Sequence, residues 1–324
     1  MRILRHHTDV PRAARGAVVA IGNFDGVHRG HVAVINEAER VARRFGAPWA
    51  VLTFEPHPRQ MFQPSTAPFR ITPFRAKARR LAELGVDYMI NLRFDPRMAG
   101  LLAQDFVMEV LVKGFNIHHV VAGPDFAFGK GRRGNAYVLS HMAEMEGFGF
   151  TQIEAVRRGG GPYTSTEVRV LLRRGLVDEA AAVLGRLWEF EGRVFKGDAR
   201  GRQLGFPTAN LAVEGQLYPG PGIYAVRAGL AEEGRMVWYD GVASLGRRPT
   251  FGGETMLLEV YVFDFDRDLY GRRLRVAFAE RIRKEKKFDR IESLKSQMAA
   301  DCRRARQILA DPKMMGRVSD PPAA

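Results

Sequence analysis

The sequence contains one cysteine, Cys302, in 324 residues. A single thiol excludes an internal disulfide framework, and it is typical of a reducing compartment. Long apolar runs are missing too: nowhere do about 18 apolar residues follow one another, and Met1–His7 lack the apolar segment of a signal peptide. We therefore expect a cytoplasmic protein that is neither secreted nor inserted into a membrane.

Internal repeats and low-complexity tracts are also lacking, which excludes solenoids and propellers. The chain is 46% hydrophobic and 27% charged, which is ordinary for a folded protein. At roughly 150 residues per domain, its length indicates two domains.

Acidic residues are in the minority: the chain has 36 Asp and Glu but 50 Lys and Arg, which gives a formal charge of +14. This balance favours anionic partners, such as nucleic acid, anionic lipid or phosphorylated small molecules. Many of the arginines form scattered doublets, such as Arg43-Arg44 and Arg272-Arg273. Scattered charge is typical of solvated faces, so the charge alone selects none of these partners.

The first part of the chain, residues 1–184, has the pattern of a parallel α/β domain. Short apolar runs alternate with amphipathic stretches, as in strands joined by crossover helices. Helices are expected to begin at Thr72-Pro73 and to span Thr166–Arg174 and Val177–Leu184. The expected strands are Ala17–Ile21, Trp49–Phe54, Tyr88–Leu92, His119–Ala122 and Thr151–Val156.

The second part, residues 185–311, has the pattern of a small β-barrel with a terminal helix. From Trp188 the helical period gives way to alternating runs rich in aromatic and β-branched residues, separated by Gly and Pro. A charged helix is expected from Arg290 to Leu309, and residues 312–324 are expected to form a flexible tail. The expected strands are Trp188–Phe195, Ile223–Ala228, Val237–Ala243, Leu257–Phe263 and Leu274–Phe278.

A candidate site, Gly22-Asn23-Phe24-Asp25-Gly26-Val27-His28-Arg29-Gly30-His31, follows the first strand and leads into a helix. Ligands of parallel sheets bind beyond the carboxyl ends of strands, where a helix N-terminus offers N–H groups to a phosphate. His28 and His31 are three residues apart, so both imidazoles could reach one phosphoryl group. Alternatively, the histidines are surface residues of an exposed turn or an incidental zinc pair, although no cysteine or third histidine is near in sequence.

A second glycine-rich stretch, Gly129–Gly134, matches G-x-G-x-x-G but is not expected to bind a dinucleotide. That fingerprint requires a strand immediately before it, whereas Pro124–Phe128 separates this stretch from the strand that ends at Ala122. The sequence also lacks G-x-x-x-x-G-K-[ST], which excludes a P-loop ATPase.

The barrel half carries two further candidates. Thr208 and Asn210 are two residues apart in an extended segment and would place two neutral oxygens on one side, as Mg²⁺ prefers. The same segment is also typical of an ordinary loop. Glu259 is the sole charge in Leu257–Phe263, so it is either a carboxylate on a half-exposed strand face or a general base.

These stretches together resemble a known family over residues 14 to 310. In the first half, the blocks that follow strands resemble those of the FMN adenylyltransferase module of bacterial bifunctional riboflavin kinase/FAD synthetases: Gly22–His31, Thr53–Pro58, Gly123–Gly131 and Thr164–Arg169. In the barrel half, the blocks resemble those of riboflavin kinases, beginning with G-R-x-L-G-F-P-T-A-N: Gly201–Asn210, Gly246–Phe251, Glu259–Phe265, Leu269–Gly271 and Arg281–Phe288.

The resemblance implies a Rossmann-like nucleotidyltransferase domain followed by a riboflavin-kinase-like β-barrel. The barrel would phosphorylate riboflavin to FMN with ATP, and the first domain would adenylylate FMN to FAD with a second ATP, releasing pyrophosphate. Mg²⁺ would accompany ATP, and FMN and FAD would be substrate and product rather than prosthetic groups. Neither nucleic acid nor a membrane is an expected partner.

The resemblance also implies roles for individual residues. Glu259 would be the general base that takes the proton of the attacking hydroxyl, and His28 and His31 would stabilise the transition state at the α-phosphorus. Thr208 and Asn210 would bind the metal. ATP contacts are implied for Gly22, Phe24, Asp25, Gly30, Ser165, Thr166, Arg169, Gly197, Gly201, Phe206 and Pro207. Flavin contacts are implied for His57, Asp125, Arg283, Glu285 and Phe288.

Three positions depart from the family pattern in the adenylyltransferase half. Ala127 stands where the family often has Arg, Thr164 replaces a common Ser, and Asp125 stands where some members have Asn. Alternatives are that only the kinase half is active, or that the chain binds flavin without turning over Mg-ATP. A nucleic-acid-binding protein would explain the charge, but the sequence has no helix-turn-helix, zinc or RNA-recognition motif.

Overall fold

The structure, a computed structural model, describes residues 1–63, 68–159, 161–197, 201, 204–213, 215–250 and 253–311. Its contacts group the chain into two compact units. The sheet unit comprises Met1–Ala67 and Thr72–Thr164, and the barrel unit comprises Pro68–Ile71 and Ser165–Ala324. The tail expected at 312–324 lies outside the described residues. Among the helices that are described, none is both long and apolar enough to cross a membrane.

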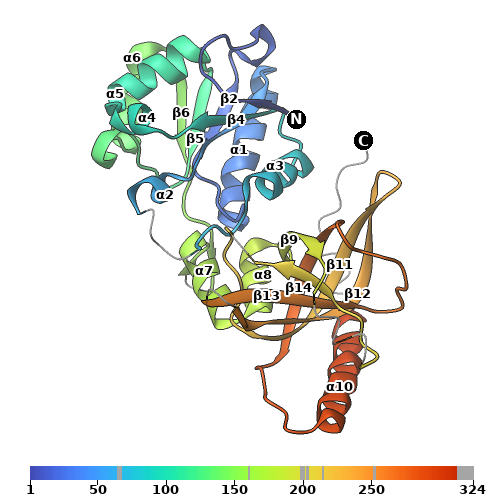
Figure 1. Ribbon diagram of the computed structural model, residues 1–324. Coiled ribbons are helices and arrows are strands. Elements are labelled where there is room, and N and C mark those ends of the chain that lie inside the picture. Colours follow the sequence, from blue (N-terminus) through green and yellow to red (C-terminus); the bar gives the residue numbers. More distant parts are fainter. Residues whose placement is uncertain are drawn as a thin grey trace. The chain divides into compact units, whose positions relative to one another are not determined.

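The sheet unit is built on a six-stranded parallel sheet of order β1-β4-β3-β2-β5-β6 (Figure 1). The strands are β1 (Arg2–Leu4), β2 (Val18–Ile21), β3 (Trp49–Glu55), β4 (Tyr88–Arg93), β5 (His119–Ala122) and β6 (Gly149–Gln152). The helical segments are η1 (Arg12–Ala14), α1 (Arg29–Phe45), α2 (Pro58–Phe62), α3 (Phe74–Glu83), α4 (Pro96–Gly100), α5 (Ala103–Asp105), η2 (Phe106–Gly114), η3 (Lys130–Arg132) and α6 (Ala136–Glu146). A short hairpin joins β7 (Arg157–Arg158) to β8 (Gly161–Pro162).

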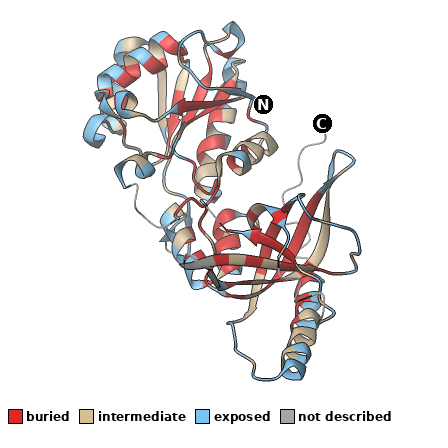
Figure 2. Cartoon of the chain, in the orientation of Figure 1, coloured by how far each residue is buried: buried red, intermediate tan, exposed pale blue. Residues whose placement is uncertain are grey.

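Helices cover both faces of this sheet, as the apolar pattern of its strands requires. In β2, Val19 and Ile21 pack on one face, and Val18 and Ala20 pack on the other. Segments η2 and α6 cover the first face, and α1 and α3 cover the second. The strands therefore form a buried layer (Figure 2), and the loops at their carboxyl ends are left to bind ligands.

Several elements of the sheet unit differ from the sequence prediction, among them β1, β6 and α3. Strand β1 is too short to show alternation, and pairing with β4 holds it in place. Strand β6 is Gly149–Gln152 rather than Thr151–Val156, because Gly147 ends α6 in a left-handed conformation and the pairing with β5 begins at Gly149. Helix α3 has Pro73 as its N-cap, so it begins one residue later than expected.

The barrel unit closes antiparallel strands in the order β10-β13-β12-β11-β14-β9 (Figure 1). The strands are β9 (Trp188–Phe195), β10 (Ala209–Ala212), β11 (Gly222–Glu232), β12 (Arg235–Thr250), β13 (Gly253–Val262) and β14 (Arg273–Arg283). Glu233 and Gly234 join β11 to β12 with φ of 47° and 78°, as a two-residue hairpin turn requires. Strand β10 is absent from the sequence prediction. Each of the other strands includes the whole of its expected run, except that β13 ends at Val262, one residue before the expected end.

Helices α7 (Ser165–Arg174), α8 (Val177–Leu184) and α10 (Ile291–Leu309) belong to the barrel unit. Helix α8 packs against β14 and β9, and α7 packs against α8. The division by contacts therefore falls after Thr164, upstream of the boundary expected after Leu184. Where the two activities divide along the chain stays a prediction.

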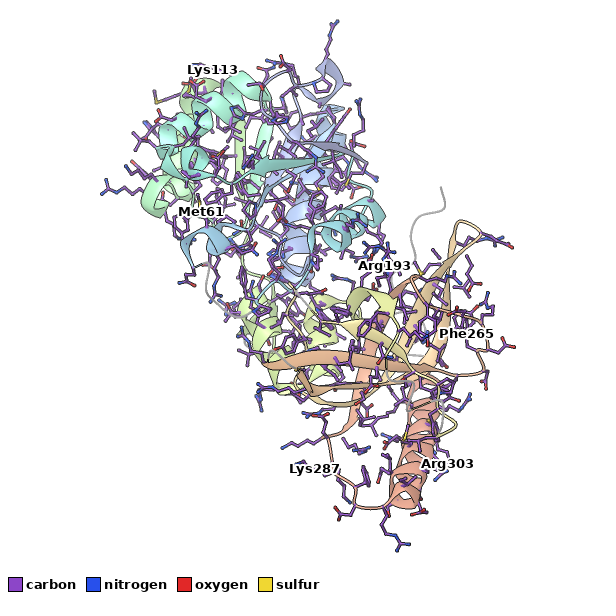
Figure 3. All side chains as sticks on the ribbon, viewed as in Figure 1. Met61, Lys113, Arg193, Phe265, Lys287 and Arg303 are labelled. Carbon is purple, nitrogen blue, oxygen red and sulfur yellow. The ribbon has the colours of Figure 1, made fainter. Side chains whose placement is uncertain are left out.

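Helix α10 is amphipathic and covers part of the barrel. Its Ala305 and Ile308 are buried against Ala277 and Phe263 of the barrel. Its other side is charged, and the labelled side chain of Arg303 is exposed (Figure 3). The terminal helix expected from the sequence is thus confirmed.

Candidate active sites

The turn between β2 and α1 has an uncommon backbone conformation. Phe24, Gly26 and Val27 have φ of 48°, 92° and 41°, and non-glycine residues rarely adopt such values. Phe24 and Asp25 are buried, and the Asp25 carboxylate accepts a hydrogen bond from the Thr72 amide at 3.0 Å. Strained residues of this kind persist where the surroundings hold them, and they cluster at functional sites.

The structure brings His28 and His31 together at the start of α1. His28 is the N-cap, and its Nδ1 accepts a hydrogen bond from the His31 amide at 3.3 Å. The two imidazoles stack with their centroids 3.6 Å apart, and Phe24 packs edge-on against His31 at 5.2 Å. Because Nδ1 of His28 accepts, the neutral ring carries its proton on Nε2, which makes that nitrogen a hydrogen-bond donor.

Two glycines bring the backbone close to this histidine pair. A Cβ on Gly30 would lie 3.1 Å from the Tyr163 carbonyl oxygen and 3.2 Å from the His28 ring. A Cβ on Gly22 would lie 3.3 Å from the ring of Phe24. The residues with implied ATP contacts in this stretch therefore surround one turn, and Phe24 and Asp25 contribute to its shape with buried side chains.

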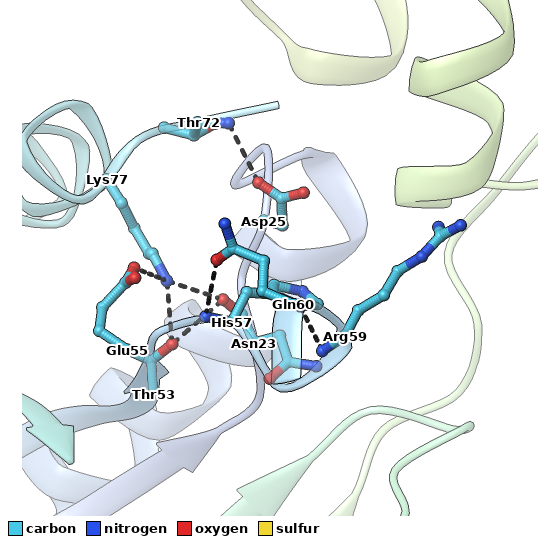
Figure 4. A network of polar contacts seen from close by, with 9 residues as sticks. All are labelled: Asn23, Asp25, Thr53, Glu55, His57, Arg59, Gln60, Thr72 and Lys77. Atoms are coloured by element: carbon cyan, nitrogen blue, oxygen red, sulfur yellow. Dashed lines mark hydrogen bonds and ion pairs between the residues drawn. The ribbon is translucent and has the colours of Figure 1, made fainter. Parts of the chain in front are cut away.

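Buried polar groups tie this turn to the end of β3 (Figure 4). Thr53 Oγ1 donates to the Asn23 carbonyl oxygen at 3.1 Å, and Lys77 Nζ donates to the same oxygen at 3.1 Å and to Thr53 Oγ1 at 3.1 Å. Glu55 Oε1 lies 3.6 Å from Lys77 Nζ. The sequence analysis did not identify Lys77, because a lysine in a helix rich in Arg and Lys is expected on the solvent side. In the structure, Lys77 is buried, with an exposed fraction of 0%.

The two flavin-contact candidates of the sheet unit lie in different surroundings. His57 is buried and caps α2: its Nδ1 accepts from the Arg59 amide at 3.1 Å, and its own amide donates to Gln60 Oε1 at 3.2 Å (Figure 4). Asp125 is exposed in the segment after β5. Flavin contacts of either residue stay predictions.

A row of phenylalanines lies beyond the carboxyl ends of β3, β4 and β5. Phe94 packs edge-on against Phe54 at 5.6 Å and against Phe62 at 6.0 Å, and Phe126 stacks on Phe128 at 5.3 Å. Phe62 is 68% exposed although it is large and apolar. The sequence analysis missed this row, because phenylalanines near strands are expected in the core.

The G-x-G-x-x-G stretch forms a tight turn away from any strand end. Strand β5 ends at Ala122, and Phe128 pairs with Gly134 across the turn. Gly129 has φ of 71°, and a Cβ there would lie 2.8 Å from the backbone of Ala103. Among the described residues, no strand therefore directly precedes the stretch, in agreement with the sequence interpretation, and Gly129 and Gly134 allow close packing.

Ser165, Thr166 and Arg169 lie on α7, in the barrel unit. Ser165 and Thr166 form the first turn of the helix, as the sequence predicts. Arg169 Nε donates to the Phe69 carbonyl oxygen at 2.9 Å, and the guanidinium lies 5.6 Å from the centroid of the Phe69 ring. The segment 68–71 thus holds one side of this guanidinium, and a contact with pyrophosphate stays a prediction.

In the barrel, Asn210 on β10 lies directly opposite Glu259 on β13. Directly opposed residues of antiparallel strands share one face, with Cβ atoms about 4.5–5.5 Å apart. Asn210 is buried and Glu259 is half-buried. Ser244 on β12 opposes Glu259 from the other side, which places a hydroxyl-bearing residue beside the carboxylate. Sequence reasoning did not identify this serine.

The loop before β10 folds closely around Thr208 and Asn210. A Cβ on Gly197 would lie 2.6 Å from Asn210 Nδ2, and one on Gly201 would lie 3.3 Å from Thr208 Oγ1. The Phe206 amide donates to the Gly201 carbonyl oxygen at 2.8 Å. The ring of Phe206 packs edge-on against Tyr261 at 5.6 Å, and Pro207 is exposed in the same loop. The structure thus brings the predicted ATP and metal residues of the barrel together.

The third group in the barrel unit comprises Arg283 at the end of β14 and two residues of the segment after it. The Arg283 guanidinium carbon lies 5.8 Å from the centroid of the Phe288 ring. The guanidinium also forms an ion pair with Asp301 of α10. The Glu285 carboxylate lies against the backbone of Gly246, where a Cβ would not fit. Arg283, Glu285 and Phe288 therefore occupy one segment, and their flavin contacts stay predictions.

Within the part of the chain that the structure describes, no three His, Cys, Asp or Glu side chains gather as a metal-binding group. The zinc alternative for His28 and His31 therefore has no third ligand of these types among the described residues.

A turn between a parallel strand and a helix N-terminus is typical of proteins that bind nucleotides or other phosphates, and the Asn–Glu pair in the closed barrel forms a second candidate site. Residues 10–167 match the family model of FAD synthetase, and residues 184–309 match that of riboflavin kinase. The chain belongs to the bifunctional riboflavin kinase/FMN adenylyltransferases, which confirms the resemblance and the expected fold.

Relatives of the whole chain support this assignment. The bifunctional riboflavin kinase/FMN adenylyltransferase of Escherichia coli (strain K12) is 40% identical over 309 residues, which are 95% of this chain and 97% of that protein. That of Pseudomonas fluorescens is 39% identical over 96% of this chain and 98% of its own. A crystal structure titled as a macrolide-efflux protein from Streptococcus pneumoniae matches with a TM-score of 0.83 and 32% identity, covering 92% of this chain and 96% of that one.

Proposed function

We propose that the barrel unit phosphorylates riboflavin to FMN and that the histidine turn of the sheet unit adenylylates FMN to FAD. Family membership supports both activities. The observation that carries the assignment of the kinase is the position of Asn210 directly opposite Glu259 in neighbouring strands. A metal ligand and a base are needed within reach of one hydroxyl for phosphoryl transfer, and the register of Asn210 and Glu259 supports these two roles.

In the kinase reaction, Glu259 accepts the proton of the ribityl 5′-hydroxyl as that oxygen attacks the γ-phosphorus of ATP. The close backbone at Gly197 and Gly201, with Phe206 and Pro207, holds the nucleotide. The hydroxyl of Ser244, beside Glu259, is placed to orient the carboxylate or the substrate. Positioning and charge stabilisation supply most of the rate in such transfers.

The residues around Asn210 fit a magnesium ion. Thr208 and Asn210 offer a hydroxyl and an amide oxygen beside the Glu259 carboxylate, and Mg²⁺ binds such hard oxygens together with phosphate oxygens. Thr208 and Asn210 would hold the ion, which would neutralise charge on the β- and γ-phosphates.

In the adenylyl transfer, the phosphate of FMN attacks the α-phosphorus of ATP and pyrophosphate leaves. The Nε2–H of His28 and the imidazole of His31 donate to the α-phosphoryl oxygens, where negative charge develops. The amides at the start of α1 add further donors. Ser165, Thr166 and Arg169 hold the departing pyrophosphate, with Mg²⁺ accompanying the ATP.

The flavin rings need apolar surfaces at both sites. In the sheet unit, the exposed ring of Phe62 and its neighbour Phe94 offer an aromatic surface, and His57 and Asp125 flank the same strand ends. In the barrel unit, Arg283, Glu285 and Phe288 contact the isoalloxazine directly or order the segment that does. Riboflavin, ATP, FMN, FAD and pyrophosphate are then the ligands of a cytoplasmic enzyme that needs neither nucleic acid nor a membrane.

The test is chromatographic separation of flavins after the full chain is incubated with riboflavin or FMN, ATP and Mg²⁺. Glu259→Ala should abolish FMN formation and leave FAD formation from FMN intact, and His28→Ala should do the reverse. Glu292→Ala, which removes a carboxylate with a 78% exposed side chain, is the matched control and should change neither rate. Equal loss of both activities in either site variant would contradict the assignment, and wild-type rates in both variants would remove Glu259 and His28 from the chemistry. No conversion by the unsubstituted chain would leave it as a flavin-binding protein.

A further inference from the structure

Lys77 is a buried charge that the proposed chemistry does not use. It lies on α3, where Leu81, one turn later, is the other buried residue. An apolar side chain at 77 would pack on the same side of α3 without the cost of taking an ammonium out of water. The ammonium is instead within 3.1 Å of two oxygen acceptors and 3.6 Å from the Glu55 carboxylate (Figure 4).

The acceptor that matters is the carbonyl oxygen of Asn23. This residue directly precedes the turn in which Phe24, Gly26 and Val27 have positive φ, and the turn ends at His28. Both Lys77 Nζ and Thr53 Oγ1 donate to this one oxygen. Both hydrogen bonds are 3.1 Å long, and at equal length a hydrogen bond from an ammonium is stronger than one between neutral groups, so Lys77 is the stronger of the two anchors.

A second anchor comes from the same part of the chain. The amide of Thr72, just before α3, donates to the Asp25 carboxylate inside the turn. The start of α3 therefore holds the turn at Asn23 through Lys77 and at Asp25 through Thr72. Since this turn sets where α1 begins, the two anchors determine where the stacked imidazoles of His28 and His31 lie.

We propose that Lys77 is a positioning residue for adenylyl transfer: its ammonium holds the Asn23 carbonyl and thereby fixes the strained turn that presents His28 and His31 to ATP. Glu55 offsets the buried positive charge. This inference rests on the proposed role of the two histidines. Lys77 touches neither nucleotide nor flavin, so its removal should lower the turnover of FMN to FAD without weakening FMN binding in proportion.

The first test is Lys77→Met, which keeps an unbranched side chain one atom shorter and removes the ammonium. We expect kcat for FAD formation to fall by about 100-fold, the effect of misplacing catalytic groups by roughly 1 Å. KM for FMN should stay within a factor of about two, and riboflavin phosphorylation, in the other unit, should be unchanged. The matched control is Lys113→Met, because Lys113 is an exposed lysine of the same unit paired with Glu109; both activities should persist.

The second test separates positioning from general destabilisation. In Lys77→Ala, added ethylammonium chloride should restore much of the FAD-forming rate, while tetramethylammonium chloride, which cannot donate, should not. Wild-type kcat in Lys77→Met, or a loss that ethylammonium does not reverse and that is accompanied by a lowered Tm, would overturn the inference.

The triple variant His28→Ala/His31→Ala/Lys77→Met distinguishes this inference from the proposed function. If Lys77 acts through the two histidines, the triple variant should be no slower than His28→Ala/His31→Ala. A slow His28→Ala beside a wild-type Lys77→Met would refute only the role of Lys77. A wild-type rate in His28→Ala would refute the role of His28 itself, and with it the route proposed for Lys77.

Discussion

Two guanidinium nitrogens of Arg283, at the end of β14, donate hydrogen bonds to the carboxylate of Asp301 on helix α10. Arg283 Nε donates to the Asp301 oxygens at 3.0 and 3.1 Å, and a terminal nitrogen donates at 2.7 Å. Gln297, one turn earlier on α10, donates to the same carboxylate at 2.9 Å. The Asp301 side chain is only 5% exposed, so this carboxylate is committed to holding the segment that begins at Arg283.

Replacing Asp301 with Asn should weaken this attachment. The free energy of unfolding of the barrel unit should fall by about 1.5–3 kcal/mol, the contribution of hydrogen bonds to charged groups. If the segment 283–288 faces the flavin, KM for riboflavin should rise while FAD formation from FMN is unchanged. Denaturant unfolding and separate assays of the two reactions measure these effects. Glu292→Gln, on the exposed side of α10, is the control; an unaltered KM for riboflavin would count against a flavin role for this segment.

Gly197 offers a second test of the barrel site. Because a Cβ at 197 would lie 2.6 Å from Asn210 Nδ2, Gly197→Ala should displace the Asn210 amide. The kinase rate should fall by about 10- to 100-fold, as when residues that support metal ligands are changed. The Mg²⁺ concentration needed for half-maximal activity should rise as well. Gly100→Ala adds a methyl group where nothing lies within 4 Å and should have no effect; an unchanged magnesium requirement in Gly197→Ala would argue against Asn210 as a ligand.

Local pattern was sufficient for much of the fold. Strand β9 and helix α8 have the bounds expected from sequence, because each is a periodic run closed by a glycine or an aromatic cluster. Strands β1 and β10 are three and four residues long, too short for a periodic signal. They exist because β4 and β13 pair with them, and such pairing depends on parts of the chain far away in sequence.

The candidate sites, too, could be predicted from the sequence only where the relationship between residues is local. The spacing of His28 and His31 on one helix start is local, so the sequence predicted that they meet. The register that puts Asn210 opposite Glu259 is not local, and only the resemblance to a family suggested that these residues share a site. Lys77 and Asp301 escaped notice because each is an ordinary charge in a charged helix until packing buries it.

The lone thiol should be slow to react at neutral pH. Burial, with the neighbouring Asp301 carboxylate, raises the pKa of Cys302 to about 11. The reactive thiolate forms as pH rises through the pKa, so at pH 8 it should be about 100-fold scarcer than for a free thiol of pKa about 9. Mass spectrometry after iodoacetamide treatment at pH 8 should show slow labelling of the native chain and fast labelling in denaturant. Equal rates in the two states would mean that Cys302 is not shielded.

Phe62 tests the aromatic surface proposed for FMN in the sheet unit. Its side chain is 68% exposed and contacts Phe94 only edge-on at 6.0 Å, so Phe62→Ala should leave the free energy of unfolding almost unchanged. Loss of one aromatic contact is worth about 0.5–1.5 kcal/mol, so Kd for FMN should rise roughly 2- to 10-fold. Quenching of flavin fluorescence on titration with FMN gives this constant, and the titration should be carried out in Glu259→Ala. Binding at the barrel should be assessed in a separate titration with riboflavin. Tyr137→Ala, at a 79% exposed aromatic of the same unit, is the matched control. If the two substitutions weaken FMN equally, or neither does, the flavin lies elsewhere than on Phe62.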